Sequence, residues 1–313
     1  MNAHNIILEK ATDCITSNEV LRNNGRSFYW ARFFLGEQAA ENATRLYSFC
    51  RYLDDVADGD IAGGLPRLQS LRNQLNGNEK IQDRRLLNYL SLYEDKQAAK
   101  IYALNLLEGL ISDQGLVNLT NDEELIRYGY FVAGTVGLMM SPFLGVADAK
   151  ALPFAIDLGV AMQLTNICRD VLEDAESGRR YIPVALTTEQ ICMASEDPES
   201  DNARLIAEEI NRILDIADGY YQSGLEGLYF LSPQSQKAIA VTAMVYRQIG
   251  IKLRENNTDW FNGRTVVSSF EKITPTMKAL FSVNEWVSNE PSHKVDLHTH
   301  LRDLPGANGL SHL

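Results

Sequence analysis

The sequence predicts an all-α fold built as a single domain. Apolar residues recur at helical spacing through most of the chain, only nine prolines interrupt the 313 residues, and no series of alternating polar and apolar residues marks a sheet. The length allows a large buried core. A hydrophobic content of 45% and a charged content of 22% are typical of a soluble globular protein.

The helices are expected in the long segments that lie between the prolines. In chain order they are residues 5–22, 38–58, 65–76, 84–93, 97–113, 121–140, 151–176, 200–224, 234–255 and 267–282. No repeat, low-complexity linker or break in composition divides them, so residues 1–288 are expected to form one domain. Residues 289–313 carry scattered polar side chains and are expected to form a loosely ordered C-terminal tail.

Charge and the rarer residue types exclude several classes of function. A net charge of −12 without a basic stripe argues against a nucleic-acid partner. The four cysteines are scattered without a CxxC pair, which is typical of reduced thiols in the cytoplasm, and the N-terminus has no signal-peptide pattern. All five histidines lie near the chain ends, with none between residues 5 and 292, which counts against triad hydrolases and zinc enzymes.

The segment 163–183, QLTNICRDVLEDAESGRRYIP, carries a polar stripe on a predicted helix. The residues of this stripe are spaced three and four apart and therefore share one face: Gln163, Asn166, Asp170 and Asp174. Two carboxylates one turn apart repel each other unless a cation lies between them, and oxygen ligands of this kind suit Mg²⁺ shared with substrate phosphates. Nearby arginines offer donors for phosphate oxygens: Arg169, Arg179 and Arg180. An isolated acidic pair is also common on solvated helix faces, so it is a weak signal by itself.

A second stripe of the same kind lies in the segment 47–58, YSFCRYLDDVAD. Its members are again spaced three and four apart: Tyr47, Arg51, Asp54 and Asp58. The neighbouring Asp55 lies about 100° around the helix from Asp54 and is expected to face outward. If the two stripes face each other across a helical bundle, four carboxylates converge and require divalent cations, which together make a cradle for diphosphate.

Residues 128–147 contain no charged side chain, a length that allows a bilayer span. Four glycines and the pair Ser141-Pro142 weaken that interpretation, and a buried helix at the centre of the domain is favoured. The small residues Ala133, Gly134 and Gly137 suit either the wall of an apolar pocket or close packing on a neighbouring helix. The sequence does not separate these two roles.

Taken together, these stretches resemble the squalene/phytoene synthase family, the head-to-head prenyl synthases of the all-α isoprenoid synthase fold. The matching segments are RSFYWA (26–31), YSFCRYLDDVAD (47–58), YGYFVAGTVG (128–137) and QLTNICRDVLEDAESGRRYIP (163–183). They span most of residues 24–264, and the last one is very specific. The resemblance implies a single-domain helical bundle around a central apolar cavity.

The resemblance also implies roles for individual residues. The expected metal ligands are Asp54, Asp58, Asp170 and Asp174, with Asn166 beside them. The expected substrate-binding residues are Arg26, Ser27, Phe28, Tyr47, Arg51, Gln163, Asn166, Arg169, Tyr181, Tyr246 and Arg264. The residues expected to take part in the reaction are Tyr47, Arg51, Asp54, Tyr128 and Asp170. The hypothetical tunnel wall contains Val132, Ala133, Gly137, Leu138, Met139 and Met162.

Some of these assignments have ordinary structural alternatives. Tyr47 and Tyr181 are also suited to a protein core, and one of Arg179 and Arg180 is expected to be a solvated charge. The sequence DLHTH at 296–300 has the composition of a metal site but is better interpreted as part of a polar tail. Asn24 and Gly25 differ from the family's usual residues before the Ser-Phe pair, which leaves the contacts of that segment open.

The expected activity is Mg²⁺-dependent condensation of two prenyl diphosphates, with Mn²⁺ as an alternative ion. Two geranylgeranyl diphosphates giving phytoene is preferred, through a cyclopropylcarbinyl diphosphate. The main alternative is farnesyl diphosphate giving presqualene diphosphate, squalene or dehydrosqualene, with NADPH needed only for squalene. A non-catalytic lipid-binding protein is the alternative from another class. The expected location is the cytoplasm, with peripheral contact at the inner membrane left open, as are chain length and oligomeric state.

Overall fold

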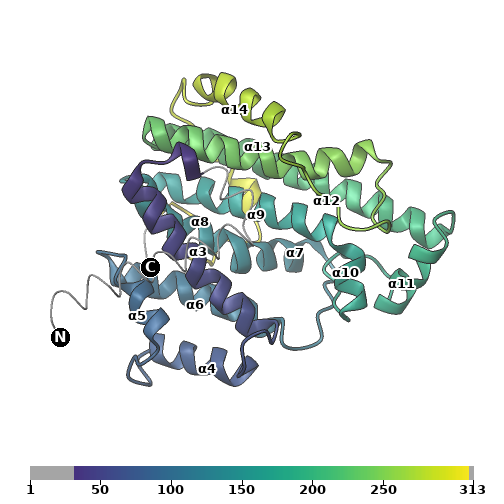
Figure 1. The fold of residues 1–313 in the computed structure, drawn as a ribbon, viewed down its shortest axis with the longest axis horizontal. Coiled ribbons are helices and arrows are strands. Elements are labelled where there is room, and N and C mark those ends of the chain that lie inside the picture. The colour runs from purple at the N-terminus through teal and green to yellow at the C-terminus, as the bar shows by residue number, and fades with distance from the viewer. Residues whose placement is uncertain (1–31, 310–313) are drawn as a thin grey trace.

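The computed structural model describes residues 32–309, which form a layered helical bundle (Figure 1). The α-helices are α3 (Glu37–Ala57), α4 (Gly64–Leu75), α5 (Arg84–Leu90), α6 (Lys96–Ser112), α7 (Asp122–Gly129), α8 (Thr135–Met140), α9 (Leu152–Arg169), α10 (Val171–Glu176), α11 (Thr188–Glu196), α12 (Asp201–Glu226), α13 (Pro233–Glu255) and α14 (Ile273–Trp286). Shorter helical turns are η1 (Arg32–Phe34), η2 (Tyr130–Gly134), η3 (Ser141–Leu144), η4 (Ala149–Ala151), η5 (Gly227–Phe230) and η6 (Val295–His298). Within these residues there is no strand, only a single bridge between Asn118 and Arg180. The all-α prediction is confirmed.

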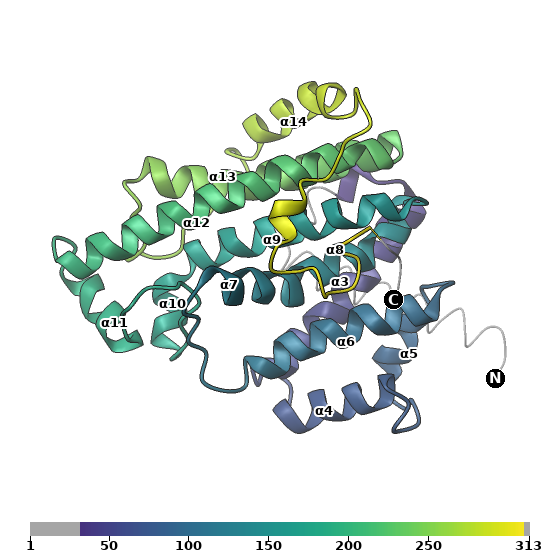
Figure 2. The ribbon, with the colours of Figure 1, turned by 180° about the vertical axis from the view of Figure 1, so that it is seen from behind.

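Helix α9 lies at the centre of the bundle, packed against α12, α13 and the α7–η2–α8 segment (Figure 2). It can approach that segment closely because glycines lie at the crossing. A Cβ atom on Gly159 would lie 2.3 Å from the carbonyl oxygen of Ala133, and one on Gly137 would lie 2.2 Å from that of Ala155. Gly137 of the uncharged stretch therefore permits close packing, one of the two roles left open by the sequence, and it also lines the apolar cavity described below, which is the other role.

The other half of the bundle consists of α3, α4, α5 and α6, which pack on one another, with α4, α5 and α6 below α8 in Figure 1. Helices α5 and α6 begin at Asp83 and Asp95, whose carboxylates accept hydrogen bonds from the first-turn backbone amides. Phe49 of α3 stacks on Tyr89 of α5 with ring centroids 4.1 Å apart. Because α3 packs on α4, α5 and α6 in this way, its apolar side lies in the core and its acidic stripe points toward α9.

Two predicted helices are interrupted, and both interruptions lie near the acidic stripes. The helix expected over 151–176 ends at Arg169, and Asp170 has φ −106° and ψ 15° before α10 begins. The amide of Asp174 still bonds the carbonyl of Asp170 at 2.8 Å, so the two acids keep one-turn spacing. The helix expected over 121–140 contains a π-helical turn, η2, a distortion that is frequent at functional sites.

One short helix was not predicted. Helix α11 begins with a capping box, in which the Thr187 hydroxyl accepts from the Gln190 amide and the Gln190 side chain accepts from the Thr187 amide. Its nine residues bury only a narrow apolar face, so the spacing of apolar residues is too short a pattern to predict this helix.

The residues 149–169 are long and apolar enough to cross a membrane by length and composition, yet 78% of the most apolar window is buried inside the protein. The stretch 128–147, considered for the same role from the sequence, divides into η2, α8 and η3 and packs against α9 and α6. Both are helices of the protein core, as favoured by the sequence for the second stretch.

The C-terminal segment is not loosely ordered, and that expectation was wrong for residues 289–309. His298, 1% exposed, donates its Nδ1–H to the Ala307 carbonyl over 2.7 Å, and its Nε2 lies 2.8 Å from Asp157 Oδ1. His293 reaches the other oxygen of Asp157 at 2.8 Å, and Ser223 bonds that oxygen too. A buried carboxylate on α9 thus needs partners, and the tail supplies them. The segment passes behind α9 in the view of Figure 1 and in front of it in Figure 2.

The DLHTH sequence itself does not form a compact group of ligands. Its one buried histidine, His298, joins His293 and Asp157 within 4.8 Å, a set of residues that also has the composition of a metal site. The contacts are ordinary hydrogen-bond lengths that satisfy the carboxylate directly. We interpret this cluster as an anchor for the C-terminal segment.

Candidate active site

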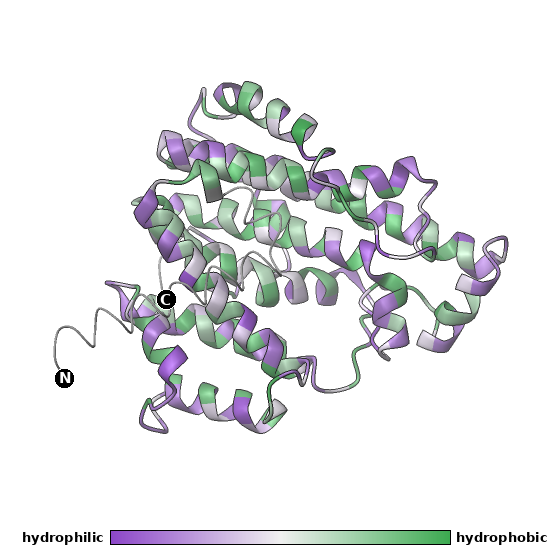
Figure 3. Cartoon of the chain, in the orientation of Figure 1, coloured by the Kyte–Doolittle hydropathy of each residue, from purple (hydrophilic) through white to green (hydrophobic). Residues whose placement is uncertain are grey.

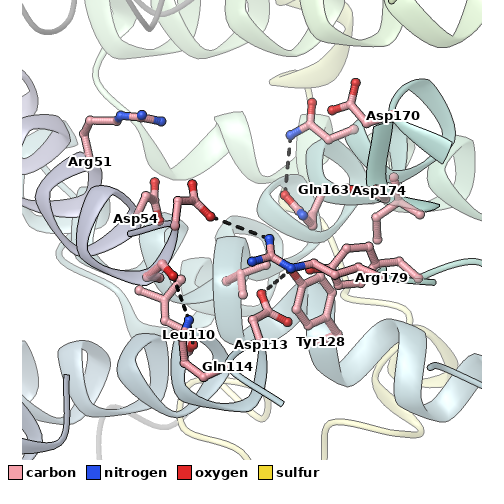
Figure 4. Close-up of a pocket in the computed structure, with 16 residues that line it drawn as sticks. Arg51, Asp54, Leu110, Asp113, Gln114, Tyr128, Gln163, Asp170, Asp174 and Arg179 are labelled. Atoms are coloured by element: carbon pink, nitrogen blue, oxygen red, sulfur yellow. Dashed lines mark hydrogen bonds and ion pairs between the residues drawn. The ribbon is translucent and has the colours of Figure 1, made fainter. Parts of the chain in front are cut away.

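Two rows of aspartates face each other across a polar pocket of about 250 Å³ (Figure 4). Asp54 and Asp58 lie at the C-terminal end of α3, and Asp170 and Asp174 lie at the junction of α9 and α10. Because residues four apart share one helical face, each helix presents both of its acids to the pocket. The two stripes identified in the sequence are therefore brought together.

The carboxylates are held in an environment that resists their ionisation. Burial, together with the charge of nearby Asp58, raises the pKa of Asp54 to about 7, although Arg51 opposes the shift. Burial also raises the pKa of Asp174 to about 7, with Asp170 adding to the shift and Arg179 opposing it. A divalent cation would favour the ionised form of every carboxylate in the row, so this electrostatic arrangement suits a bound metal ion.

Arginines partly neutralise the two rows. Arg264 Nε lies 2.9 Å from Asp170 Oδ1, and Arg169 Nη2 lies 2.5 Å from Asp170 Oδ2. Arg179 reaches Asp58 at 3.6 Å from the opposite side of the pocket. Guanidinium groups in such positions can exchange carboxylate oxygens for phosphate oxygens, because they bind both with the same geometry.

Two of the expected arginines have other main contacts. Arg51 lines the pocket, but its Nη2 pairs with Asp55 at 2.6 Å and with Asp60 at 3.6 Å. Asp55 does not line the pocket, in agreement with its expected position on the helix. Arg180 is turned away: its guanidinium bonds the Asn118 side chain and two backbone carbonyls of the loop that follows, and it is 6% exposed. It is neither a phosphate donor nor a solvated charge.

One residue of the pocket was missed by the sequence analysis. Asp113 follows the last residue of α6, is buried, and accepts a hydrogen bond from the Tyr128 hydroxyl at 2.9 Å. The ring of Tyr128 stacks on that of Tyr181 with centroids 4.7 Å apart. Burial raises the pKa of Asp113 to about 6, while bonds from the two tyrosines and the charge of Arg179 lower it. No spacing rule marks a single acid at the end of a helix, so no signal in the sequence points to this residue.

The polar pocket opens into an apolar cavity of about 310 Å³ inside the bundle. Four residues line both: Asp54, Val132, Gln163 and Asn166. The deeper walls come from η2, α8, α9, η5 and α13 and include Ala133, Val136, Gly137, Met140, Phe154, Leu158, Met162, Leu228 and Tyr246. Tyr47 lies at the rim on α3, one turn before Arg51. Figure 3 shows mostly hydrophobic colouring along the central helices α8 and α9 and a mixture of both colours on the outer helices.

The expected tunnel wall needs one correction. Val132, Ala133, Gly137 and Met162 line the cavity, whereas Leu138 and Met139 are both 0% exposed within the core and lie outside its lining. The neighbouring Val136 and Met140 take those places. The lining positions 132, 133, 136, 137 and 140 are spaced as one face of a helix, and Leu138 and Met139 lie outside that face.

The residues present fit a hard divalent cation. The four aspartates and Asn166 offer oxygen donors, the type that Mg²⁺ prefers. The side-chain oxygen of Asn166 is buried and has no hydrogen-bond partner among the described residues. A buried acceptor without a donor is costly, and a cation supplies what this one lacks.

Not all expected substrate-binding residues can be placed. Arg26, Ser27 and Phe28 lie outside the described residues. Arg169 lies beside the pocket through its contact with Asp170 but does not line it. The remaining expected residues line the polar pocket, the apolar cavity or both, except Arg264, which reaches the pocket through Asp170.

Comparison with known proteins identifies the source of this geometry. The sequence profile of the squalene/phytoene synthase family matches residues 21–271. The chain belongs to the squalene/phytoene synthase family. Within the family, it is 33% identical over 262 residues to a 15-cis-phytoene synthase of Enterobacter agglomerans, covering 79% of this chain and 88% of the relative. It is also 33% identical over 272 residues to a phytoene synthase of Thermus thermophilus, covering 84% and 91% respectively.

The fold agrees with that of a solved member of this squalene/phytoene synthase family. A crystal structure of a dehydrosqualene synthase in complex with a ligand superposes with a TM-score of 0.76 at 26% identity, covering 89% of this chain and 99% of the other. The resemblance stated from the sequence motifs is thereby confirmed, and so is the isoprenoid synthase fold. The chain is a prenyltransferase of the squalene/phytoene synthase type.

Proposed function

We propose that this synthase joins two molecules of geranylgeranyl diphosphate head to head to give phytoene. The observation that carries the proposal is the pair of opposed aspartate rows at the mouth of an apolar cavity. A charged diphosphate fits the mouth and a hydrocarbon chain fits the interior. The phytoene synthase relatives at about one-third identity support the C20 substrate.

The diphosphates would be held with Mg²⁺, or with Mn²⁺ as an alternative ion. The residues that would hold it are Asp54, Asp58, Asn166, Asp170 and Asp174. When bound, the ion would neutralise the diphosphate and make it a better leaving group. Arg51, Arg179 and Arg264 would bind the remaining phosphate oxygens by charge-assisted hydrogen bonds, in exchange for their present carboxylate partners.

The apolar cavity would protect and orient the cation that forms when the diphosphate leaves. Among the described residues, its walls hold no charged side chain apart from Asp54 at the mouth, and such a lining would keep water and competing nucleophiles from the reacting carbons. Two chains held side by side place the allylic cation against the double bond of the second substrate. Loss of a proton then closes a cyclopropylcarbinyl diphosphate, and a second ionisation with rearrangement gives the joined hydrocarbon.

Farnesyl diphosphate is the alternative substrate, favoured by the likeness in fold to a dehydrosqualene synthase. Its products would be presqualene diphosphate, dehydrosqualene or, with NADPH as reductant, squalene. We propose action in the cytoplasm, with peripheral contact at the inner membrane because the substrate carries a long hydrocarbon chain and the product is a hydrocarbon. A non-catalytic lipid-binding role is disfavoured by the retention of all four aspartates.

The test is incubation of the purified protein with each prenyl diphosphate and Mg²⁺, with and without NADPH, followed by mass analysis of extracted products. The proposal expects a C40 hydrocarbon from geranylgeranyl diphosphate that does not depend on NADPH. A C30 product from farnesyl diphosphate, with no C40 product, would assign the alternative. Release of diphosphate without any joined hydrocarbon would overturn head-to-head condensation.

A further inference from the structure

The hydrogen bond between Asp113 and Tyr128 defines the direction in which the tyrosine hydroxyl can act. Asp113 Oδ2 lies 2.9 Å from Tyr128 Oη. An ionised carboxylate can only accept a hydrogen bond, so the phenol must be the donor in this pair. The phenolic proton is therefore directed to Asp113, and the hydroxyl oxygen, which also interacts with the Tyr181 hydroxyl, keeps a lone pair for a group in the pocket.

The surroundings fix both partners. The Tyr128 ring is held by its stack on Tyr181, with an interplanar angle of 27°, and lines the polar pocket next to Val132, which also lines the apolar cavity. Asp113 follows the end of α6, is 9% exposed, and its Oδ1 is buried with no hydrogen-bond partner among the described residues. Figure 4 shows Asp113 between Arg179 and Tyr128, below the acidic rows.

We propose that Asp113 is a positioning residue that turns Tyr128 into a hydrogen-bond acceptor at the boundary between the diphosphate pocket and the apolar cavity. The inference rests on the proposed condensation and deepens it by naming where the proton of the ring-closing step goes. That boundary is where the reacting carbon next to the diphosphate must lie, because the diphosphate is on one side and the chain on the other.

The step balances with groups that the pocket contains. The C–H bond of the cationic adduct breaks, and its electron pair forms the third carbon–carbon bond of the cyclopropane. The proton passes to the oxygen of Tyr128, while the proton already on that oxygen passes to Asp113 Oδ2. The tyrosine begins and ends neutral, and the charge of the cation is matched by that of the carboxylate. No external acid or base is needed.

A competing role exists for the same side chain. Asp113 lies in a pocket with four aspartates, and its unpartnered Oδ1 is an oxygen donor of the kind that binds Mg²⁺. If Asp113 were a fifth carboxylate ligand of the metal, replacing it would weaken Mg²⁺ binding, and its effect would not depend on Tyr128. The two roles predict different effects on a double-mutant cycle and on the Mg²⁺ dependence.

The experiment compares Asp113→Asn, Tyr128→Phe and the double variant with the wild type, using geranylgeranyl diphosphate and a Mg²⁺ titration. We expect each single change to lower kcat about 100-fold, with KM and half-saturating Mg²⁺ changed less than about twofold. Because the two residues act as a unit, the double variant should be no slower than the slower single variant. Asp201→Asn, the same change at an exposed carboxylate remote from the pocket, is the matched control and should be unaffected.

Two results would overturn the inference. Losses that multiply in the double variant would show that Asp113 does not act through Tyr128. A rise of about tenfold or more in half-saturating Mg²⁺ for Asp113→Asn would assign it to the metal instead. Circular dichroism checks that each variant folds, and Asp113→Ser replaces Asp113→Asn in the cycle if the latter does not. A wild type that converts no prenyl diphosphate overturns the proposed function itself, whereas an active wild type with an additive cycle overturns only this inference.

Discussion

Binding of Mg²⁺ should release protons, in a number that depends steeply on pH. Asp54 and Asp174 each have a pKa near 7 in the metal-free protein, because burial and neighbouring carboxylates disfavour their ionised forms. A metal ion binds the ionised forms and displaces the protons. With both values at about 7, binding should release about 1.8 protons at pH 6, about 1 at pH 7 and about 0.2 at pH 8.

The same raised pKa values predict how stability depends on pH. A carboxyl group whose pKa is higher in the folded than in the unfolded protein binds protons more tightly when folded. Between the unfolded value near 4 and the folded value near 7, the metal-free protein should therefore lose stability as pH rises. A difference of one between the folded and unfolded pKa values of a group corresponds to about 1.4 kcal/mol of unfolding free energy. Mg²⁺ should reverse this loss, so the rise in Tm on adding Mg²⁺ should be larger at pH 8 than at pH 6.

The assay is titration calorimetry of Mg²⁺ in two buffers of different ionisation enthalpy at each pH, with thermal unfolding measured in parallel. Asp54→Asn should remove about half of the proton release, because one of the two titrating groups is lost. Asp201→Asn, on an exposed residue, serves as the control and should leave it unchanged. Proton release that stays near zero at pH 6, or that does not vary with pH, would refute the electrostatic account of the pocket.

Three further predictions concern stability and substrate binding. Asp157→Asn leaves two histidines of the C-terminal segment without their buried carboxylate partner. It should lower the free energy of unfolding, measured by urea denaturation, by about 3 kcal/mol. An unchanged denaturation midpoint would show that the segment is not anchored there. Gly159→Ala places a methyl group 2.3 Å from the Ala133 carbonyl oxygen and should lower the free energy of unfolding by about 2 kcal/mol in the same assay. Gly219→Ala, with open space around the added methyl group, should not lower it. Equal effects of the two changes would contradict the close crossing of the helices. Arg179→Gln should raise KM for the prenyl diphosphate about tenfold through loss of a charge-assisted phosphate contact, with unfolding unaffected; an unchanged KM would remove this arginine from the diphosphate site.

Sequence periodicity predicted the helices well wherever an apolar face is long. Helices α3, α12 and α13 lie within two residues of their expected ends, because each presents a continuous apolar stripe to the core. The break at Asp170 and the π-helical turn after Gly129 were not predictable in this way. Both are local departures from regular helical hydrogen bonding that depend on tertiary contacts. The spacing of apolar residues stays helical through them, so the sequence does not show them.

The pocket was predictable where its residues come in pairs with helical spacing, as Asp54 with Asp58 and Asp170 with Asp174. Asp113 has no such partner in the sequence, and only the fold brings it to Tyr128. Spacing also could not show that the two stripes lie opposite each other, since that depends on how α3 packs across the bundle from α9. The resemblance to the family supplied that relation before the structure did.

The polar tail illustrates a different limit. Scattered polar residues usually indicate a solvated segment, but those at 293 and 298 are histidines that meet a buried carboxylate 136 and 141 positions away. Asp157 lies in the otherwise apolar first half of α9, where a buried charge needs a partner. The sequence thus contained a charged residue in an apolar stretch that required a partner. It did not show which residues those partners are.

The most direct test of the central claim, that the opposed aspartates hold Mg²⁺ for ionisation of a prenyl diphosphate, is turnover of geranylgeranyl diphosphate by Asp54→Ala and Asp170→Ala beside the wild type at saturating Mg²⁺. The account predicts a C40 hydrocarbon from the wild type, and from either variant none above background while its helical circular dichroism stays near normal. Full activity in either variant would contradict the metal assignment.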